Sequence, residues 1–370
     1  MDTPSGPGPA AVEDVGQTST DAARRGEPPA QPDLSVCVPT YRRPALMERA
    51  VTSAMAGAAA AAARVEILVS DNSPEESEGA ARALLREWPG PATYIANETD
   101  IGLIGNLNQC RSRAAGRWVL ILHDDDYLQP GGVDAILEAI DSAEPSDHVL
   151  LFGTSVVDEH GHILRQQLHP SDRRLPPSQA LRRVLTDSSY VRFPAVVVRR
   201  SAYEDVGPFS AEAAQATDFD MWIRLFAAHG VRLVPRAVSA YTVHPGALTS
   251  GMFTGEYVGI LAGCFQTALD TGVLEPEIVR RSQRDWFHQF LLAGAYRSIR
   301  QGDTAAARRV LKLFDVPTIR ALGRSRHWLL IRAAISITAL LPSPVARTLA
   351  RVVYPFDREV RSWVLDPERA

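Results

Sequence analysis

Residues 119–130, VLILHDDDYLQP, pass from an apolar run directly into a histidine and three consecutive acids. The apolar residues 119–122 are typical of a buried strand. Asp124, Asp125 and Asp126 then follow at its end, and three like charges placed together repel one another. The stretch therefore predicts a strand end at which acidic side chains require a partner.

A bound cation is one such partner. In extended backbone alternate side chains point the same way, so Asp124 and Asp126 are expected to share one side while Asp125 faces elsewhere. Two carboxylates so placed can hold Mg²⁺ or Mn²⁺, which bridges a substrate diphosphate. The alternative is a solvated acidic turn that caps the next helix.

Strand and helix patterns alternate around this stretch. The expected strands are LSVCVP at 34–39, VEILVSD at 65–71, ATYIANE at 92–98 and RWVLILHDDD at 117–126. Helix-forming runs lie between them, at 45–63, 78–88 and 102–116. This alternation predicts an α/β fold with a mostly parallel, Rossmann-like sheet flanked by helices. Ligands of such sheets bind at the carboxyl ends of the strands, where Pro39, Asp71 and Asp126 lie.

Three regions follow from composition and pattern. Residues 1–32 hold six prolines and four glycines and no leucine, so they are expected to form a disordered tail. Residues 33–250 carry the α/β pattern. Residues 251–370 are mainly helical by pattern, which predicts a helical C-terminal extension.

The overall charge, the cysteines and the absence of one motif each argue against a class of function. A net charge of −4 does not suggest a broad nucleic-acid footprint. The three cysteines have no zinc spacing and no disulfide framework, which favours a reducing, cytoplasmic location. No G-x-G-x-x-G follows any expected strand, so a dehydrogenase is disfavoured.

The most apolar piece of the C-terminal region is HWLLIRAAISITALLP at 327–342. It is too short to cross a membrane and is interrupted by Arg332. Two interpretations remain: a helix docked on the core, or a peripheral membrane contact helped by nearby arginines at the inner face of a membrane.

Four stretches occur in order along the chain: 34–55, 66–77, 97–132 and 217–230. Their motifs include VPTYRR, VSDNSPEES, LHDDD and TDFDMWIRL. Together they resemble the inverting family-2 glycosyltransferases of GT-A fold, over roughly residues 33–250.

The resemblance implies a set of residues for the nucleotide-sugar donor. The VPTYRR match implies that Pro39, Thr40 and Tyr41 cradle the base and ribose. Asp71 matches the acid that accepts a hydrogen bond from the base, usually uracil or thymine, although a helix N-cap is an alternative. Asn97 falls where the family approaches the nucleotide, and a helix entry explains it equally well.

The same resemblance implies metal and catalytic residues. Asp124 is assigned to ribose or metal-water contact and Asp126 to direct metal coordination, with Asp125 as a further donor-site residue. His244, in AYTVHPG, resembles a histidine that approaches the metal or diphosphate. Asp218 aligns with the catalytic base, but Thr217 replaces the usual glutamate beside it, which leaves Asp220 as an alternative. Trp222 either lines the acceptor site or belongs to the core.

The expected activity is transfer of a sugar from a UDP- or dTDP-sugar to an acceptor hydroxyl, with Mg²⁺ or Mn²⁺. The acceptor classes are a sugar, a lipid-linked intermediate and a small molecule, in bacterial cell-surface glycan or natural-product synthesis. Two alternatives are a sugar-phosphate nucleotidyltransferase and a non-catalytic nucleotide-binding scaffold. The first is disfavoured because VPTYRRPA has no glycine-rich phosphate loop.

Overall fold

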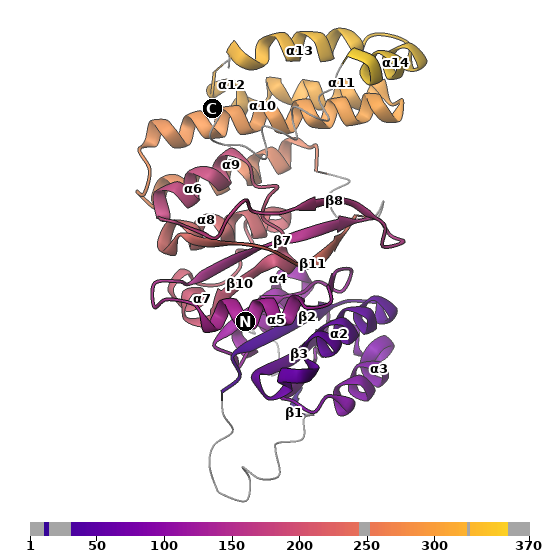
Figure 1. The fold of residues 1–370 in the computed structure, drawn as a ribbon. Helices are drawn as coiled ribbons and strands as arrows, with labels where there is room; N and C mark the ends of the chain where they lie inside the picture. The colour runs from indigo at the N-terminus through magenta and orange to yellow at the C-terminus, as the bar shows by residue number, and fades with distance from the viewer. Residues whose placement is uncertain (1–10, 15–30, 244–251, 324–325, 354–370) are drawn as a thin grey trace, which may run out of the picture. The chain divides into compact units, whose positions relative to one another are not determined.

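The computed structural model of the protein describes residues 11–14, 31–243, 252–323 and 326–353 (Figure 1). The chain divides into two compact units. Unit 1 comprises residues 1–175, 191–209 and 229–244, and unit 2 comprises residues 176–190, 210–228 and 245–370. Residues 176–190 and 210–228 belong to the same compact unit as the C-terminal helices.

Unit 1 contains a sheet of eleven strands among the described residues, in the order β1-β4-β3-β2-β5-β10-β7-β11-β6, with β8 paired to β7 and β9 to β11. The strands are β1 Ala11–Asp14, β2 Leu34–Thr40, β3 Val65–Asp71, β4 Ala92–Ala96, β5 Trp118–Ile121, β6 Tyr127–Leu128, β7 Val149–Val157, β8 Ile163–Gln167, β9 Arg173–Leu175, β10 Val196–Arg199 and β11 Val231–Thr242. β2, β3, β4 and β5 run parallel, which confirms the expected α/β architecture.

The second half of the sheet is mixed rather than mostly parallel. β10 runs antiparallel to both β5 and β7, and β8 runs antiparallel to β7. Parallel neighbours need a long crossover, usually a helix, whereas β7 and β8 are joined by the short segment 158–162. Only β7 and β11 pair in parallel in this half of the described sheet.

Helices cover both faces of the parallel strands. α2 Pro44–Ala58, α3 Pro74–Glu87 and α5 Gly132–Asp141 share one apolar core with alternate residues of β2 and β3. α4 Gly102–Arg113 packs on the opposite face, where the Cys37 thiol meets the Cys110 carbonyl at 3.8 Å. All three cysteines are buried and free. The shorter helices of unit 1 are η1 Ala59–Arg64, η2 Phe193–Ala195 and α7 Arg200–Val206.

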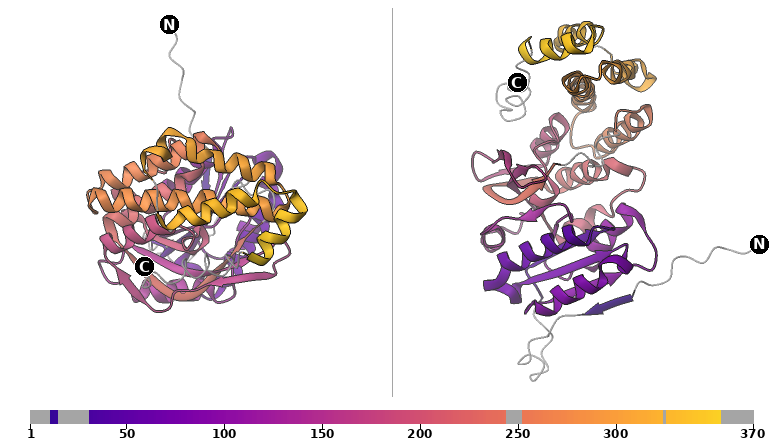
Figure 2. Two further views of the ribbon diagram at one scale, coloured as in Figure 1. Left: turned by 90° about the horizontal axis from the view of Figure 1, so that it is seen from above. Right: turned by 90° about the vertical axis from the view of Figure 1, so that its right-hand side faces the viewer.

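The expectation of a disordered tail over residues 1–32 is wrong at one short segment. Ala11–Asp14 form strand β1, which pairs antiparallel with Thr93–Ala96 and lies at the edge of the sheet (Figure 2, right). Without β1, β4 would be the edge strand and would present unpaired N–H and C=O groups. Backbone pairing needs no apolar side chains, so composition did not indicate it.

Unit 2 is helical among its described residues. It contains α6 Pro177–Thr186, η3 Ala214–Ala216, residues 217–228 of α8 Thr217–His229, α9 Gly255–Asp270, α10 Pro276–Gln301, α11 Thr304–Lys312, η5 Leu313–Asp315, α12 Pro317–Ala321, α13 Arg326–Thr338 and α14 Ser343–Val353. α10 is its central element and packs against α6, α9, α11, α13 and α14. The predicted C-terminal helices are thus present. Among the described residues, no helix combines the length and apolar character that spanning a bilayer requires.

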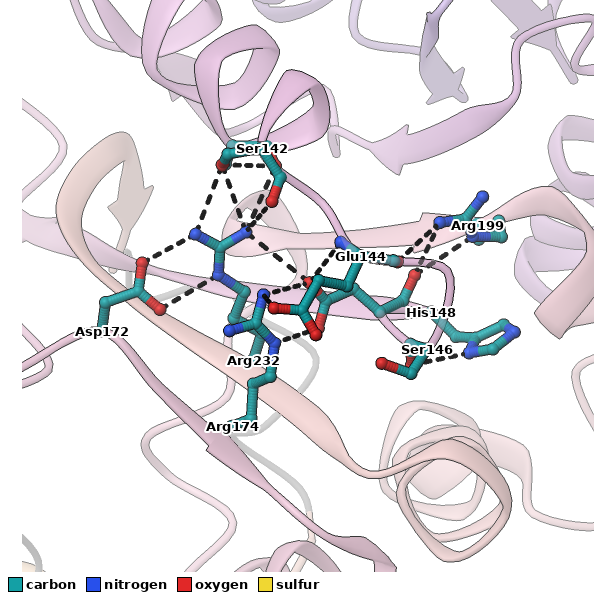
Figure 3. A network of polar contacts seen from close by, with 10 residues as sticks. Ser142, Glu144, Ser146, His148, Asp172, Arg174, Arg199 and Arg232 are labelled. Carbon is teal, nitrogen blue, oxygen red and sulfur yellow. Dashed lines mark hydrogen bonds and ion pairs between the residues drawn. The ribbon is translucent and has the colours of Figure 1, made fainter.

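An ionic network, buried at Arg232 and Asp147 and exposed at Asp172 and Arg174, connects the second half of the sheet with α5 (Figure 3). Arg232, at the start of β11, makes two bonds to Asp172 (3.0 and 2.8 Å) and contacts the Ala139 and Ser142 carbonyls, both at 3.4 Å. Asp147 accepts two bonds from Arg174, at 2.9 and 2.8 Å. Burial acts to raise the pKa of Asp147, but the Arg174 hydrogen bonds and the nearby guanidinium groups hold that pKa below its ordinary value.

We expect Arg232→Met to lower the free energy of unfolding by about 1–3 kcal/mol, because it removes the cation that contacts the buried Asp147 carboxylate and the Ala139 and Ser142 carbonyls. Arg236→Met is the matched control: its ion pair with Glu138 is exposed, and such pairs contribute about 0–1 kcal/mol. Urea unfolding measures both. The hydrogen bonds from Arg232 depress the pKa of Asp172, so this stabilisation is present at neutral pH and lost as pH falls through that depressed pKa. Equal losses in the two variants would contradict a special role for Arg232.

Candidate functional site

The candidate site lies at the carboxyl ends of β2, β3 and β5 in unit 1. Thr40 and Asp71 are register partners at the ends of β2 and β3. The chain leaves β5 after Ile121 and reaches the first of the three acids, Asp124, three residues later. Parallel order therefore brings together polar side chains that are far apart in sequence, as the strand pattern predicted.

The acidic segment is a turn, so the predicted alternation of its side chains is wrong. The Asp126 amide donates to the His123 carbonyl at 3.0 Å, which closes a tight turn over residues 123–126. Asp124 accepts from the Thr40 hydroxyl at 3.0 Å, and one Arg43 nitrogen bridges Asp124 and Asp125 at 3.3 Å each. Asp125 therefore shares a partner with Asp124 and does not face away from it.

The Asp126 carboxylate has a different partner, the backbone amide of Thr242. Its Oδ1 accepts from the Thr242 amide at 2.8 Å, whereas its buried Oδ2 has no hydrogen-bond partner among the described residues. The buried Nε2 of His123 also lacks a partner within that part of the chain. His123, Asp125 and Asp126 each offer one ligand atom, and these atoms lie within 4.8 Å of one another.

This group fits a divalent cation. Carboxylate oxygens and a neutral imidazole suit Mn²⁺, and carboxylates alone suit Mg²⁺. Burial lowers the pKa of His123, which keeps its ring neutral and able to bind a metal. His123 is the ligand candidate that sequence reasoning missed, although its position directly before the acids was a usable signal.

The site concentrates negative charge in a poorly solvated place. Burial first, and the charge of Asp125 second, raise the pKa of Asp124 to about 6. The same two causes raise the pKa of Asp126 well above its ordinary value. The positive charge of Arg49 offsets part of this charge and acts to lower the pKa of Asp126. Arg49 is held there by its bond to the Asp125 carbonyl at 2.5 Å and by the Tyr127 ring, 5.0 Å away. A bound cation would offset the remainder.

The segment after β2 presents an exposed ring. Pro39 and Thr40 are buried, while Tyr41 is 40% exposed and carries the Arg42 guanidinium over its ring at 5.0 Å. Arg42 has the left-handed φ of +54°, which an L residue rarely adopts. The Ser73 hydroxyl accepts from the Arg42 amide at 2.6 Å and so holds this conformation.

Asp71 is fully buried, and its carboxylate already accepts four hydrogen bonds. The donors are the Ser73 amide (2.8 Å), the Ser73 hydroxyl (3.2 Å), the Ser77 hydroxyl (2.6 Å) and the Tyr94 hydroxyl (2.9 Å). Asp71 therefore shapes the loop that begins α3. The N-cap of α3 is Ser73, and no side chain caps that helix, so Asp71 supports the loop before α3 without being its N-cap.

Asn97 is buried in the neighbouring amide network. It donates to Asn72 at 2.9 Å and accepts from Gln109 at 3.2 Å. Asn106 on α4 was not predicted: its amide donates to the Thr40 and Ser70 carbonyls, at 3.2 and 3.1 Å, and so joins the ends of β2 and β3. An asparagine within a helix pattern carries no sequence signal for such a role.

The predicted catalytic residues lie on α8, in unit 2. Asp218 is partly exposed, and its Oδ1 accepts from the Phe219 amide at 2.7 Å. Asp220 is buried, paired with Arg224 at 2.9 Å and bonded by the Thr267 hydroxyl at 3.1 Å. Trp222 is 2% exposed, which favours the core interpretation over an acceptor contact. His244 lies outside the described residues.

The chain is similar to several known proteins. The family described as Glycosyl transferase family 2 matches residues 35–207. An uncharacterized protein of Mycobacterium tuberculosis is 30% identical over 224 residues, which cover 57% of this chain and 67% of that protein. The GalNAc(5)-diNAcBac-PP-undecaprenol beta-1,3-glucosyltransferase of Campylobacter jejuni is 29% identical over 136 residues, or 36% of this chain and 42% of that one.

Among solved structures, S. aureus TarS 1–349 in complex with UDP has a TM-score of 0.55. The match is 17% identical and covers 86% of this chain and 91% of that one. At that identity the likeness shows the GT-A fold.

We expect Mn²⁺ to raise the melting temperature of the protein by several degrees, because it binds the folded state alone. Asp126→Asn should abolish this rise, since it removes the carboxylate with the unpartnered oxygen. Asp134→Asn, at an exposed acid near the start of α5, should keep it. Thermal melts with and without Mn²⁺ provide the comparison, and an unchanged response in Asp126→Asn would rule out this metal site.

Proposed function

The chain belongs to glycosyl transferase family 2 and is a glycosyltransferase, and we propose that it is metal-dependent and inverting. The proposed reaction moves a sugar from a UDP- or dTDP-sugar to an acceptor hydroxyl. The observation that carries the proposal is the pair of buried, unpartnered atoms, Asp126 Oδ2 and His123 Nε2, beside Asp125.

Asp126, Asp125 and His123 would hold Mg²⁺ or Mn²⁺, and the cation would stabilise the charge that develops on the departing nucleoside diphosphate. His244 remains a predicted further ligand. Arg43 already pairs with Asp124 and Asp125, so a metal near these acids would compete with an existing ion pair. While no donor is bound, the Arg43 ion pair lowers the net negative charge of the site.

The donor nucleotide is assigned to Pro39, Thr40, Tyr41, Asp71 and Asn97, as the resemblance implied. The exposed ring of Tyr41 supports a stacking role against the base. Asp124, bonded to Thr40, supports a contact with the ribose. A direct bond from Asp71 to the base would have to share a carboxylate oxygen with donors from Ser73, Ser77 or Tyr94.

Asp218 is the proposed general base. It would accept the proton of the acceptor hydroxyl while that oxygen attacks the anomeric carbon from the face opposite the diphosphate. The new C–O bond forms as the bond to the diphosphate breaks, which inverts the anomeric centre. The partial exposure of Asp218 supports this assignment, as does the engagement of Asp220 by Arg224 and Thr267.

The acceptor is proposed to be a lipid-linked sugar of a bacterial cell-surface glycan. The Campylobacter jejuni relative is named as acting on an undecaprenol-linked acceptor, and its alignment with this chain supports that class. A free sugar and a small natural product are the other acceptor classes. The three buried, free cysteines support work in a reducing cytoplasm.

We expect Asp218→Asn to lower kcat by about 10²–10⁴-fold, the usual contribution of a general base, with little change in melting temperature. Asp220→Asn should instead lower the melting temperature, because it weakens the Arg224 and Thr267 contacts. Transfer kinetics and thermal melts on both variants separate the two roles. If Asp220→Asn folds normally and loses turnover while Asp218→Asn keeps it, the base is Asp220.

We expect UDP or dTDP, with Mn²⁺, to raise the melting temperature more than GDP or ADP does. EDTA should remove both this gain and the transfer of sugar. Strongest stabilisation by GDP would contradict the proposed donor base, and transfer that survives EDTA would contradict metal dependence. Pyrophosphate release from a nucleoside triphosphate and a sugar phosphate would instead identify a nucleotidyltransferase.

A further inference from the structure

One face of α13 is apolar and exposed from residue 330 to the end of the helix. Leu330 is 82% exposed, Ile337 63% and Leu340, just past the helix, 73%, and Ala333 between them is also exposed. These positions follow one another at intervals of three and four residues, so they form one stripe on the helix. Contiguous exposed apolar side chains of this size mark an interaction surface.

The opposite face of α13 explains why the helix stays in place. Ile335 and Ala339 are buried, and α13 packs against α10. Arg332, the only charged residue between Trp328 and Leu341, lies over the Phe314 ring at 4.1 Å. Arg308 bonds to the Ala339 carbonyl at 2.6 Å. One face of the helix is therefore docked on unit 2 and the other is apolar and exposed. A docked helix and a membrane contact, the two interpretations of the sequence, are thus compatible.

The surface continues onto α14. Val345 is 48% exposed, and a shallow apolar hollow is lined by Pro344, Val345, Thr348 and Leu349. Within unit 2, α13 and α14 (yellow in Figure 2, left) lie in front of α10 and α11 in that view, and no other described helix of unit 2 covers them there. We call the exposed residues 329, 330, 333, 337, 340 and 345 the apolar stripe.

The segment that carries the stripe is strongly basic. Residues 297–351 contain ten arginines and one lysine against two acids, Asp303 and Asp315, in a chain whose net charge is −4. A second copy of this chain would therefore bring basic segments of the same sign together, which opposes pairing through the stripe. The partner that fits both features combines negative surface charge with an apolar interior.

We propose that the apolar stripe docks on the surface of an anionic lipid bilayer. The leucines and isoleucine would enter the boundary between headgroups and acyl chains, while the surrounding arginines contact lipid phosphates. The inference rests on unit 2 alone and is independent of the proposed sugar transfer.

The test is co-sedimentation of the full chain with vesicles of phosphatidylcholine, with and without phosphatidylglycerol, at low salt. The wild-type protein should bind the phosphatidylglycerol vesicles, bind pure phosphatidylcholine weakly, and be released by high salt. Leu330→Glu combined with Ile337→Glu should reduce partitioning at least about tenfold, because two apolar contacts become charged and are repelled by anionic lipid.

Ile163→Glu combined with Leu164→Glu is the matched control. These residues are 58% and 59% exposed on β8, so the control adds the same charge outside the stripe and should keep binding. Thermal melts establish that both double variants are folded. Wild-type protein that fails to bind anionic vesicles, or a stripe variant that binds as well as the control, would overturn the proposal. A wild-type dimer that the stripe variant converts to monomer without loss of vesicle binding would also overturn it, by showing that a second copy covers the stripe.

Discussion

Burial of carboxylates at the end of β5 is the constraint on which the site in unit 1 depends. Asp124 and Asp126 are 6% and 1% exposed, and neither is neutralised by a dedicated partner of its own. Several features act against this unfavourable charge: the Arg43 bridge, the Arg49 contact with the turn, the Thr40 hydroxyl and the Thr242 amide. These groups come from β2, from α2 and its N-cap residue Arg43, and from β11, so the turn also connects three elements. The proposed cation would offset the negative charge that these groups only partly balance.

The strand ends were predictable because parallel order follows from the alternation of strands and helices, and it places Thr40, Asp71 and the acids at one edge. The direction of each acid was not predictable in the same way. Side-chain alternation presumes extended backbone, and the His123–Asp126 hydrogen bond replaces it with a turn. For this reason Asp125 joins His123 and Asp126, while Asp124 joins Thr40. The motif identified the segment that carries the acids, whereas the local backbone geometry determines which residues each acid contacts.

Other features could not be predicted from the sequence, because they depend on residues that lie far away along the chain. Arg232 looks like an ordinary strand residue, yet it connects α5 with the loop at Asp172. The strand at Ala11–Asp14 depends on an available edge of β4. An apolar helix pattern likewise does not say which face is covered. The burial of Ile335 and the exposure of Leu330 on one helix supply that information.

The left-handed backbone at Arg42 has a consequence for ligand binding. Buried Asp71 positions Ser73, Ser73 fixes the Arg42 amide, and Arg42 lies against the exposed ring of Tyr41. A carboxylate without solvent exposure thus sets the position of a ring on the surface. The edge of the sheet is preorganised, since its loops are ordered by internal bonds before any ligand arrives. The proposed nucleotide donor would therefore bind with little conformational entropy lost by the protein.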